Sequence, residues 1–238
     1  MENEIFEYIS FTAHSTPYVP DSLKLEGWEP DNWVKHSDMD IPLGHSRYGG
    51  CVIDLPKGAE HPENMKFAGQ LDLAKIAPYD KSNLLPKSGQ LLFFVDDKDN
   101  GKVIYADVEN TDLIRIFREH EDNFYLGVLI DKISAETETI EERYFTEKDE
   151  EFEEDMLNEN GKMWNDFAGT EKSKMFGIYT HCQQGEEYIL EFMKSNRVVL
   201  LQIGGNGFND EGVFNVLIDK EDLKNRNFNN CIFEWAQS

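Results

Sequence analysis

Two short apolar segments, each carrying one glutamine, place the strongest constraint on how this chain folds. One is FAGQLDL, around Gln70, and the other is VVLLQIGG, around Gln202. Each precedes a glycine-led apolar segment that ends on aspartate, GQLLFFVD at 89–96 and GVFNVLID at 212–219. Apolar runs of this length, bounded by glycine, are typical of buried strands. Because the order of glutamine strand, glycine turn and apolar strand occurs twice, the sequence predicts an internal duplication.

The rest of the chain predicts a β-rich α+β fold with a few helices. Residues 111–120 fit either a strand or a helix, because their periodicity does not separate the two. Asn100-Gly101 supplies the positive φ angles of a tight hairpin turn. Further strands are expected at 6–13, 51–56, 102–109 and 124–133, and helices at 148–158 and 186–195.

The distribution of proline and charge suggests how the chain is divided. Four prolines interrupt the first 45 residues, which we expect to form a loop-rich N-terminal extension with one strand. The remainder, 46–238, is expected to form one compact domain. Its repeat-like halves are placed at about 46–130 and 175–238, and the acidic helix 148–158 lies between them.

The charge balance excludes some classes of partner. The chain has 23 basic and 47 acidic residues, a net charge of -24. Such a surface repels phosphate, so neither nucleic acid nor an anionic membrane is expected as a partner. This charge is compatible with a basic protein partner, with a cation as ligand, or simply with solubility.

Several features indicate a cytoplasmic location. No apolar stretch approaches the roughly 18 residues of a membrane span, and the N-terminus lacks the basic start of a signal peptide. The three cysteines, Cys51, Cys182 and Cys231, have no CxxC spacing. They are expected to be reduced thiols and not a disulfide framework.

No cofactor or metal is expected from the motifs. His61, His181 and Cys182, together with Cys51 or Cys231, are residue types that bind zinc, but their spacing does not indicate a zinc site. Asp96 and Asp107 fall in an EF-like register, yet strands flank the loop where helices are required, so a hairpin is favoured over calcium.

Motifs for phosphate binding and nucleophilic catalysis are equally weak. The glycines at 204–207 do not match a phosphate-binding loop and lie beside acids, with Asp210 and Glu211 as an alternative cation site. GHSRYG at 44–49 has one residue too many for a nucleophile elbow. Cys182 beside His181 is not a favourable thiolate pair, since neighbours on a strand face opposite ways. No catalytic residue is assigned.

Four segments, taken in order, resemble a known family. They are SRYGGCVIDLPKG, FAGQLDLAKI with LLPKSGQLLFFVD, KMFGIYTHCQQ, and VVLLQIGGNGFNDEGVFNVLIDKEDLKNRNF. Together they are similar to the YwqG-like family, a bacterial domain family of unknown function, from about Ser46 to the C-terminus. The chain departs from it at GFNDEG, where a tryptophan-containing loop is usual, and at His181-Cys182, where proline is common. The resemblance implies an α+β fold with internal duplication and brings no established reaction.

Four residues are the candidate ligand-binding site: Arg47, Gln70, Gln183 and Gln202. An unpaired buried amide costs about 1–3 kcal/mol, so the glutamines are expected to hydrogen-bond to irregular backbone. Alternatively, they line a pocket between the two halves, where Arg47 contacts an anion. The first function expected is therefore a non-enzymatic binding protein that sequesters a basic partner, as an immunity protein does. The second is a small-molecule binder or hydrolase that uses the groove between the halves.

Overall fold

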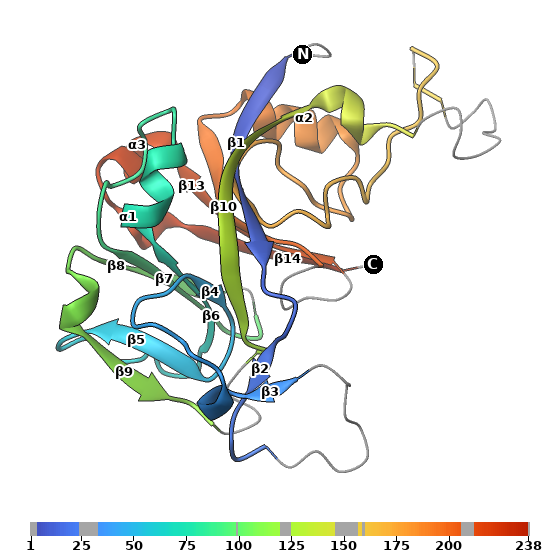
Figure 1. Ribbon diagram of the computed structural model, residues 1–238. Coiled ribbons are helices and arrows are strands. Elements are labelled where there is room, and N and C mark those ends of the chain that lie inside the picture. The colour runs from blue at the N-terminus through green and yellow to red at the C-terminus, as the bar shows by residue number, and fades with distance from the viewer. Residues whose placement is uncertain are drawn as a thin grey trace.

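The computed structural model describes residues 4–23, 33–98, 100–119, 125–145, 157–158, 160–205 and 212–237. Ten strands form one curled sheet in the order β14-β13-β12-β11-β1-β10-β4-β6-β7-β8 (Figure 1). Their bounds are β1 Ile5–Ala13, β4 Arg47–Tyr48, β6 Lys66–Asp72, β7 Gln90–Val95, β8 Gly101–Ala106, β10 Val128–Thr139, β11 Lys174–Phe176, β12 Arg197–Ile203, β13 Gly212–Asp219 and β14 Ile232–Gln237.

Two small sheets and several short helices complete the described fold. The small sheets pair β2 Tyr18–Val19 with β3 Val34–Lys35, and β5 Val52–Pro56 with β9 Leu113–Phe117. The α-helices are α1 Leu73–Ile76, α2 Glu186–Lys194 and α3 Lys220–Lys224. The 3-10 helices are η1 His36–Asp38, η2 Ala77–Tyr79, η3 Asn110–Asp112, η5 Ile140–Arg143 and η7 Phe228–Asn230.

The long antiparallel pair of β1 and β10 forms the middle of the large sheet, with Ile5 opposite Thr139 at one end. On the β1 side, β11, β12, β13 and β14 follow in chain order. On the β10 side, β4, β6, β7 and β8 do the same. The sheet is therefore built outward from its centre by two antiparallel series of four strands.

The two glutamine strands occupy the same place in these series, and both are bulged. In β6 the register shifts between Phe67 and Gly69, just before Gln70. In β12 it shifts between Val199 and Leu201, just before Gln202. An extra residue in one strand bends it and increases its twist, so the two bulges help to curl the sheet.

The two ends of the sheet approach one another, so that it forms a nearly closed barrel. A Cβ atom added to Gly101 of β8 would lie 2.3 Å from the ring of Phe233 in β14. Close by, the rings of Tyr105 and Phe228 lie 5.6 Å apart, and Arg226 forms an ion pair with Asp107 at 3.1 Å. Gly101 thus lets the last strand pack against the edge of β8.

The main core fills the concave side of this sheet, and smaller apolar clusters lie on its outer side. The two-stranded β5–β9 sheet packs Ile53 and Leu55 against Phe94 of β7. Helix α2 packs Ile189 and Phe192 against Leu217 of β13. Strands β7 and β13 are therefore covered on both faces, which explains their largely apolar sequences.

Most strand and helix predictions are confirmed. Segment 111–120, which the pattern left open, contains the strand β9 after the one-turn helix η3. The turn before β8 is a hairpin, as expected: the Asp96 carboxylate accepts hydrogen bonds from the amides of Lys98 and Asn100 at 2.8 and 2.9 Å. Asp107 lies at the far end of β8, so these two acids do not share a calcium loop.

Two further predictions concern the acidic helix and the N-terminal extension. Of the expected helix 148–158, residues 148–156 fall outside the described residues. The strand expected at 6–13 is present as β1. It lies at the centre of the sheet, although it belongs to the predicted N-terminal extension. The boundary at residue 46 stays a prediction.

Candidate functional site

Arg47, the first of the predicted site residues, is a fully buried cation on β4. Its Nε donates to the Val52 carbonyl at 3.1 Å, and Nη1 donates to the His45 carbonyl at 2.6 Å. Nη2 donates to the carboxylate of Asp54 and to the Gln70 side-chain oxygen, each at 3.0 Å. Every nitrogen of the guanidinium thus has a protein partner.

Asp54 is the only carboxylate that contacts Arg47 among the described residues, and it is shared with a second arginine. Arg115 donates to it through Nε at 2.7 Å and Nη2 at 3.0 Å, and the Gly44 amide donates at 2.9 Å. Burial by itself raises the pKa of Asp54. The hydrogen bonds and charges of the two arginines outweigh burial, so the pKa lies below its ordinary value. This carboxylate therefore stays ionised and is not a proton donor at neutral pH.

Gln70 continues the network away from Arg47. Its Nε2 donates to the Gln90 side-chain oxygen at 3.0 Å, and Gln90 donates to Asn110 at 2.6 Å. Asn110 donates in turn to Asp72 at 3.1 Å. The network therefore joins β4, β6 and β7 to the turn before β9.

A second buried charge cluster lies on the other strand series, around Lys174 of β11 and Glu138 of β10. The ammonium of Lys174 donates to Glu138 and to the Ile178 carbonyl, the latter at 2.8 Å. Arg143 and Lys172 also reach the Glu138 carboxylate, at 3.2 and 3.1 Å. Three cations therefore surround one carboxylate.

This crowding shifts the titration of both partners. Burial raises the pKa of Glu138, but the charges of Lys174 and Arg143 outweigh it and bring the pKa down to about 2. Burial lowers the pKa of Lys174 to about 7, and the attraction of Glu138 offsets burial only in part. Lys174 is thus the buried group of this cluster whose charge is most sensitive to pH near neutrality.

Gln202 contacts backbone near this second cluster. It stands opposite Lys174 in the β11–β12 register, as Gln70 stands opposite Arg47 in the β4–β6 register. Its Nε2 donates to the carbonyls of Gly169 and Lys172 at 2.9 and 2.7 Å. It therefore fastens the turn that precedes β11.

The four predicted site residues do not form one site. Arg47 and Gln70 are in direct contact, Gln202 belongs to the separate cluster around Lys174, and all three are fully buried. Gln183 is exposed on the turn before α2. Its backbone N–H donates to the His181 ring at 3.3 Å. Their role in ligand binding stays a prediction.

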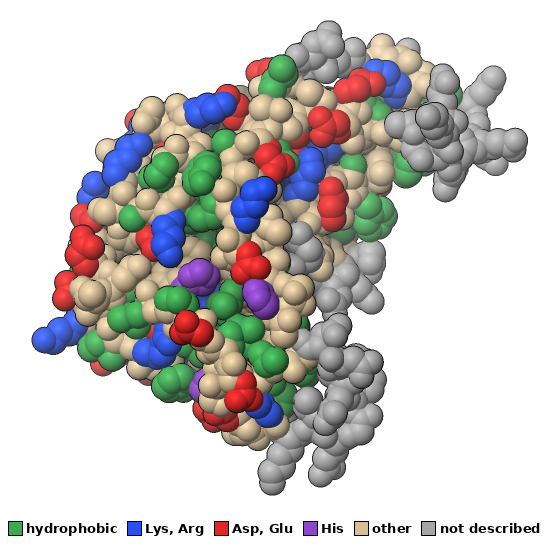
Figure 2. All heavy atoms as spheres, in the orientation of Figure 1, with side chains coloured by type: hydrophobic (Ala, Val, Ile, Leu, Met, Phe, Trp, Pro, Cys, Tyr) green, Lys and Arg blue, Asp and Glu red, His purple; other side chains and the backbone are tan. Residues whose placement is uncertain are grey.

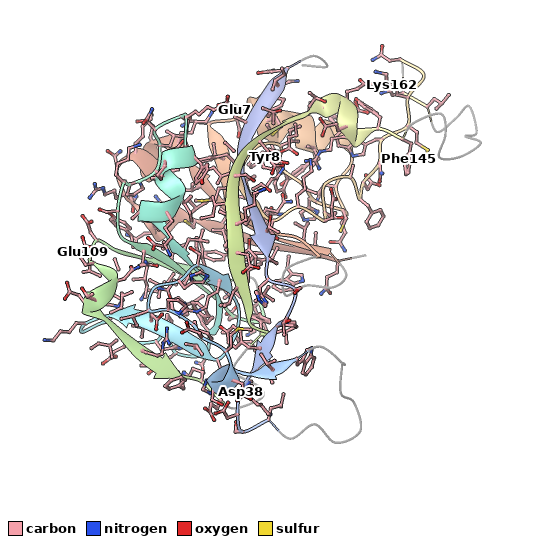
Figure 3. The ribbon with its side chains drawn as sticks, in the orientation of Figure 1. Glu7, Tyr8, Asp38, Glu109, Phe145 and Lys162 are labelled. Carbon is pink, nitrogen blue, oxygen red and sulfur yellow. The ribbon has the colours of Figure 1, made fainter. Side chains whose placement is uncertain are left out.

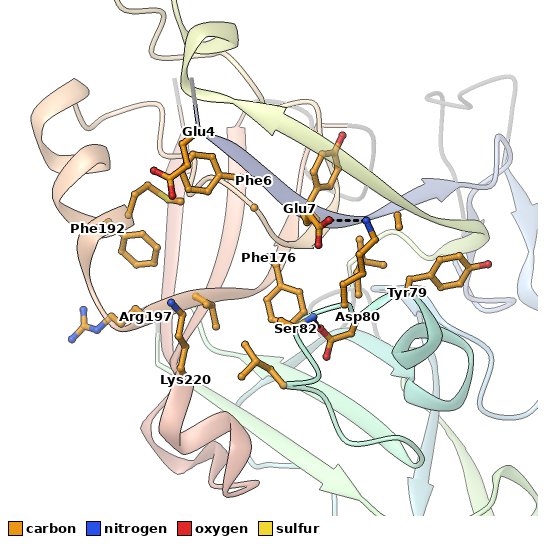
Figure 4. A pocket seen from close by; sticks show the side chains of 18 residues that line it. Glu4, Phe6, Glu7, Tyr79, Asp80, Ser82, Phe176, Phe192, Arg197 and Lys220 are labelled. Atoms are coloured by element: carbon orange, nitrogen blue, oxygen red, sulfur yellow. Dashed lines mark hydrogen bonds and ion pairs between the residues drawn. The ribbon is translucent and has the colours of Figure 1, made fainter. Parts of the chain in front are cut away.

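A cleft of about 280 Å³ opens elsewhere, beside β1 and between the two strand series (Figure 4). From one side it is lined by the segment 79–84, which follows η2. From the other it is lined by the starts of β12 and α3 and by the end of α2. Its apolar lining consists of Phe6, Ile9, Tyr79, Leu84, Ala135, Phe176, Phe192, Met193 and Val198.

Charged side chains surround this apolar lining. Glu7 and Lys81 form an ion pair of 2.6 Å across the cleft (Figure 4). In Figure 3, Glu7 and Tyr8 are neighbours on β1, and the Tyr8 hydroxyl donates to Glu136 of β10 at 2.8 Å. Asp80 is buried and accepts from the Leu85 amide at 2.8 Å. Ser82 donates its hydroxyl to Asp80 at 2.5 Å, an arrangement that closes a turn.

Neither a metal centre nor a reactive thiol forms among the residues that the structure describes. No three His, Cys, Asp or Glu side chains gather there as metal ligands. Cys51 and Cys182 are buried free thiols, and burial raises the pKa of both. Cys182 and the neighbouring His181 therefore do not form a thiolate pair. Gly207, Asp210 and Glu211 of the proposed cation loop lie outside the described residues.

Arg197 and Lys220 were not among the predicted site residues, although the strand pattern carries a signal for them. Arg197 begins β12, and Lys220 directly follows β13. The two segments were expected to be strands joined by a glycine-containing turn. In the structure they pair antiparallel, which brings the start of one beside the end of the other, with Arg197 opposite Asp219.

Fold and site together define a β-rich protein with a nearly closed sheet, two buried charge clusters and a small apolar cleft. A family model described as "Domain of unknown function (DUF1963)" matches residues 46–236. The chain belongs to this family. No curated protein matches it significantly, and no helix in the described ranges is long and apolar enough to cross a membrane.

Proposed function

We propose that the protein is a non-enzymatic binding protein whose main partner is a basic protein, which it sequesters as an immunity protein neutralises a toxin. The observation that carries the proposal is the position of the charge. The net charge is -24. The described residues bury four acids and three cations: Asp54, Asp72, Asp80, Glu138, Arg47, Arg143 and Lys174. Burial removes both signs almost equally, so the acidic excess lies outside this core.

The central charged groups of the two clusters are buried, and this supports a binding role on the surface. Arg47, Lys174 and Glu138 are the groups best suited to acid–base or anion chemistry, and each is buried and engaged by protein atoms. They stabilise the fold where they are, and a substrate would have to displace those contacts. A surface-mediated function needs no such displacement.

Helix α2 is the face that we propose for the basic partner. Its outer side exposes Glu187 and Glu191, and Tyr188 between them is 44% exposed. An exposed aromatic ring among carboxylates suits a basic partner, because aromatic anchors contribute most binding energy while charges steer the approach. On the face drawn in Figure 2, acids and cations are interspersed, so charge alone does not select a single patch there.

Charge reversal on α2 tests this proposal. The tagged protein is used to capture partners from its native cells, and each purified partner is measured at about 50 and 300 mM salt. We expect a basic partner whose affinity falls about tenfold or more at the higher salt, since screening weakens exposed charges. The double variant Glu187→Lys/Glu191→Lys is expected to lose binding. The control Glu60→Lys/Glu63→Lys, with the same charge change on the turn before β6, retains it.

The proposal fails if the captured partners are not basic, or if their binding is insensitive to salt. If both double variants bind the partner equally well, helix α2 is not the binding face. A cytoplasmic location belongs to this proposal and is supported by the three free thiols, Cys51, Cys182 and Cys231.

A second candidate function is the binding of a small molecule between the two strand series. The cleft beside β1 favours it, because the cleft lies at this junction. A hydrolase in the same place would use Ser82. Since the Asp80 carboxylate beside it also accepts from the amides of Ser82 and Leu85, we propose a turn-closing role for the pair and no catalysis.

We also propose that the two strand series arose by internal duplication, as the YwqG-like resemblance implies. The equal order of the strands, the bulges of β6 and β12, and the matching register of Arg47–Gln70 and Lys174–Gln202 support this. A test is to align the strand series 47–106 and 174–237 in structures of other members. If the two series had independent origins, the bulges and the cation–glutamine pairs would not fall at equivalent positions of the alignment.

A further inference from the structure

The cleft beside β1 combines an apolar interior with cations that have no partner. Arg197 and Lys220 both line one end of it, because Arg197 pairs in register with Asp219, the residue before Lys220. In Figure 4 the Arg197 side chain extends outward at this end of the cleft, and the two cationic groups are not in contact. The Asp219 carboxylate does not neutralise them, since it accepts from the Glu221 amide and from Asn196. Among the described residues, neither the Arg197 guanidinium nor the Lys220 ammonium has an ion-pair or hydrogen-bond partner.

The acids of the cleft are mostly engaged elsewhere. Glu7 is paired with Lys81, and Asp80 accepts backbone amides. Glu4 has no such partner in the described structure, but in Figure 4 Phe192 lies between Glu4 and the two cations. The end of the cleft at Arg197 and Lys220 therefore attracts an anion, on a protein whose net charge is -24.

The interior of the cleft suits an apolar group. Phe6, Phe176 and Phe192 point into it from β1, β11 and α2 (Figure 4). A volume of about 280 Å³ is at the lower end of the roughly 300–1,000 Å³ of ligand pockets, so the ligand is small.

Backbone strain at Phe176 supports a binding role independently. Its φ is 64°, in the left-handed region that bulky residues rarely adopt. At the matching place after β4, the chain has Gly49, with φ 50°, which tolerates this conformation. Such strain costs on the order of 1–3 kcal/mol and is concentrated at ligand clamps and active sites.

We propose that this cleft binds a small monocarboxylate with an apolar body, of the size of a medium-chain fatty acid. The carboxylate lies between Arg197 and Lys220, and the apolar body packs on the three phenylalanine rings. One negative charge fits better than two, because Glu4, Glu7 and Asp80 also line the cleft. The inference develops the second candidate function and does not depend on a basic protein partner.

Calorimetry with three eight-carbon probes tests the class of ligand. The full chain is titrated with octanoate, 1-octanol and octylammonium at constant ionic strength. We expect octanoate to bind at least about tenfold more tightly than octanol, and octylammonium not to compete. If octanol bound as tightly as octanoate, the cleft would still be a small-molecule site, but recognition of the carboxylate would be overturned. Tighter octylammonium would assign the charge recognition to Glu4, and failure of all three probes would overturn the inference.

Two kinds of variant locate the site. Arg197→Gln/Lys220→Gln is expected to weaken octanoate about tenfold or more and to leave octanol unchanged. Lys224→Gln/Arg226→Gln makes the same charge change outside the cleft and should stay within about twofold of wild type. Ala135→Phe, at an exposed strand position that lines the cleft, fills it and should abolish binding of both probes. Unchanged octanoate binding in either cleft variant would contradict the proposal.

Discussion

The two buried charge clusters occupy matching places in the two strand series but differ in chemistry. In the first, the guanidinium of Arg47 distributes its donors over two carbonyls, Asp54 and Gln70. In the second, the compact ammonium of Lys174 contacts Glu138 and one carbonyl. The planar fork of an arginine satisfies several acceptors at once, whereas a lysine acts as a point charge.

The clusters also differ in charge balance. Two arginines share Asp54, and one of them, Arg115, is 26% exposed in its side chain. Glu138 is shared by three cations, of which Lys174 and Arg143 are buried. Each cluster is centred on one carboxylate, but the first has two cations around it and the second has three. At the same position in a sheet, one network can thus keep its charges when the pH changes near neutrality, whereas another, containing Lys174, changes its charge.

Removing the charge of Glu138 should have the largest effect. Glu138→Gln leaves Lys174 and Arg143 buried without a counter-charge, and such losses cost about 3–5 kcal/mol. Urea unfolding at pH 7 measures the free energy of unfolding. The control is Glu136→Gln on the same strand, which is exposed and should cost less than about 1 kcal/mol.

The same variant has a predicted pH dependence. The pKa of Glu138 falls from its ordinary 4.5 to about 2 on folding. Its stabilisation is therefore complete above pH 4.5 and lost as the pH falls towards 2. The difference between wild type and Glu138→Gln should shrink over this interval. A constant difference would show that the carboxylate is not the ionic centre of the cluster.

Arg47→Lys should have the next largest effect. An ammonium at this place loses contact with some of the four acceptors that the guanidinium reaches, which leaves buried groups unpaired, at a cost of about 2–4 kcal/mol. The measurement is the unfolding midpoint in urea, with the exposed Arg226→Lys as control. If Arg47→Lys is as stable as wild type, the contrast between a fork and a point charge does not hold.

Lys174→Met should expose the pH response of the second cluster. The folded pKa of Lys174 is about 7, below the ordinary 10.5, so the unfolded chain binds more protons between these values. Wild type therefore gains stability over Lys174→Met as the pH rises from about 7 to 10, by up to about 1 kcal/mol per unit. Thermal unfolding across this range, with the exposed Lys132→Met as control, measures the slope. If the stability of wild type relative to Lys174→Met fell as the pH rose, the pKa of Lys174 would not be lowered on folding.

The glutamines should show the smallest effects. Gln70→Ala and Gln202→Ala should each cost about 1–3 kcal/mol, because both leave buried backbone or side-chain groups without a partner. Gln70→Ala should be the more costly, since it also leaves a donor of Arg47 unpaired. Melting temperatures provide the comparison. Unchanged melting of Gln202→Ala together with lost ligand binding would make this strand a binding site.

Local sequence patterns predicted the strands well, because their apolar runs and turn residues determine them directly. The segment around Gln70 and its echo around Gln202 are strands in matching places. The sheet order was not predictable in this way. Strand β1 is paired with residues 130–139 and 174–176, and no local pattern specifies such distant partners.

The site was predicted less well for a related physical reason. Arg47 and Gln70 were proposed to line one groove. They are in direct contact, and their hydrogen bonds are to protein groups. The partners that close these networks, Asp54 and Glu138, are unremarkable acids in a sequence with 47 of them. The positions of the cleft residues Arg197 and Lys220 depend on where β12 begins and where β13 ends, which only the register determines.

The central position of β1 has a consequence for synthesis of the chain. This strand is synthesised more than a hundred residues before the strands with which it pairs. Pairings of such long sequence separation are slow to form, because loop-closure entropy must be overcome before contacts compensate for it. Until then β1 presents unpaired edges, with Ile5 and Phe11 as part of its surface. During synthesis there is therefore a long interval in which a chaperone can bind β1. Pairing of β1 with β10 ends this interval.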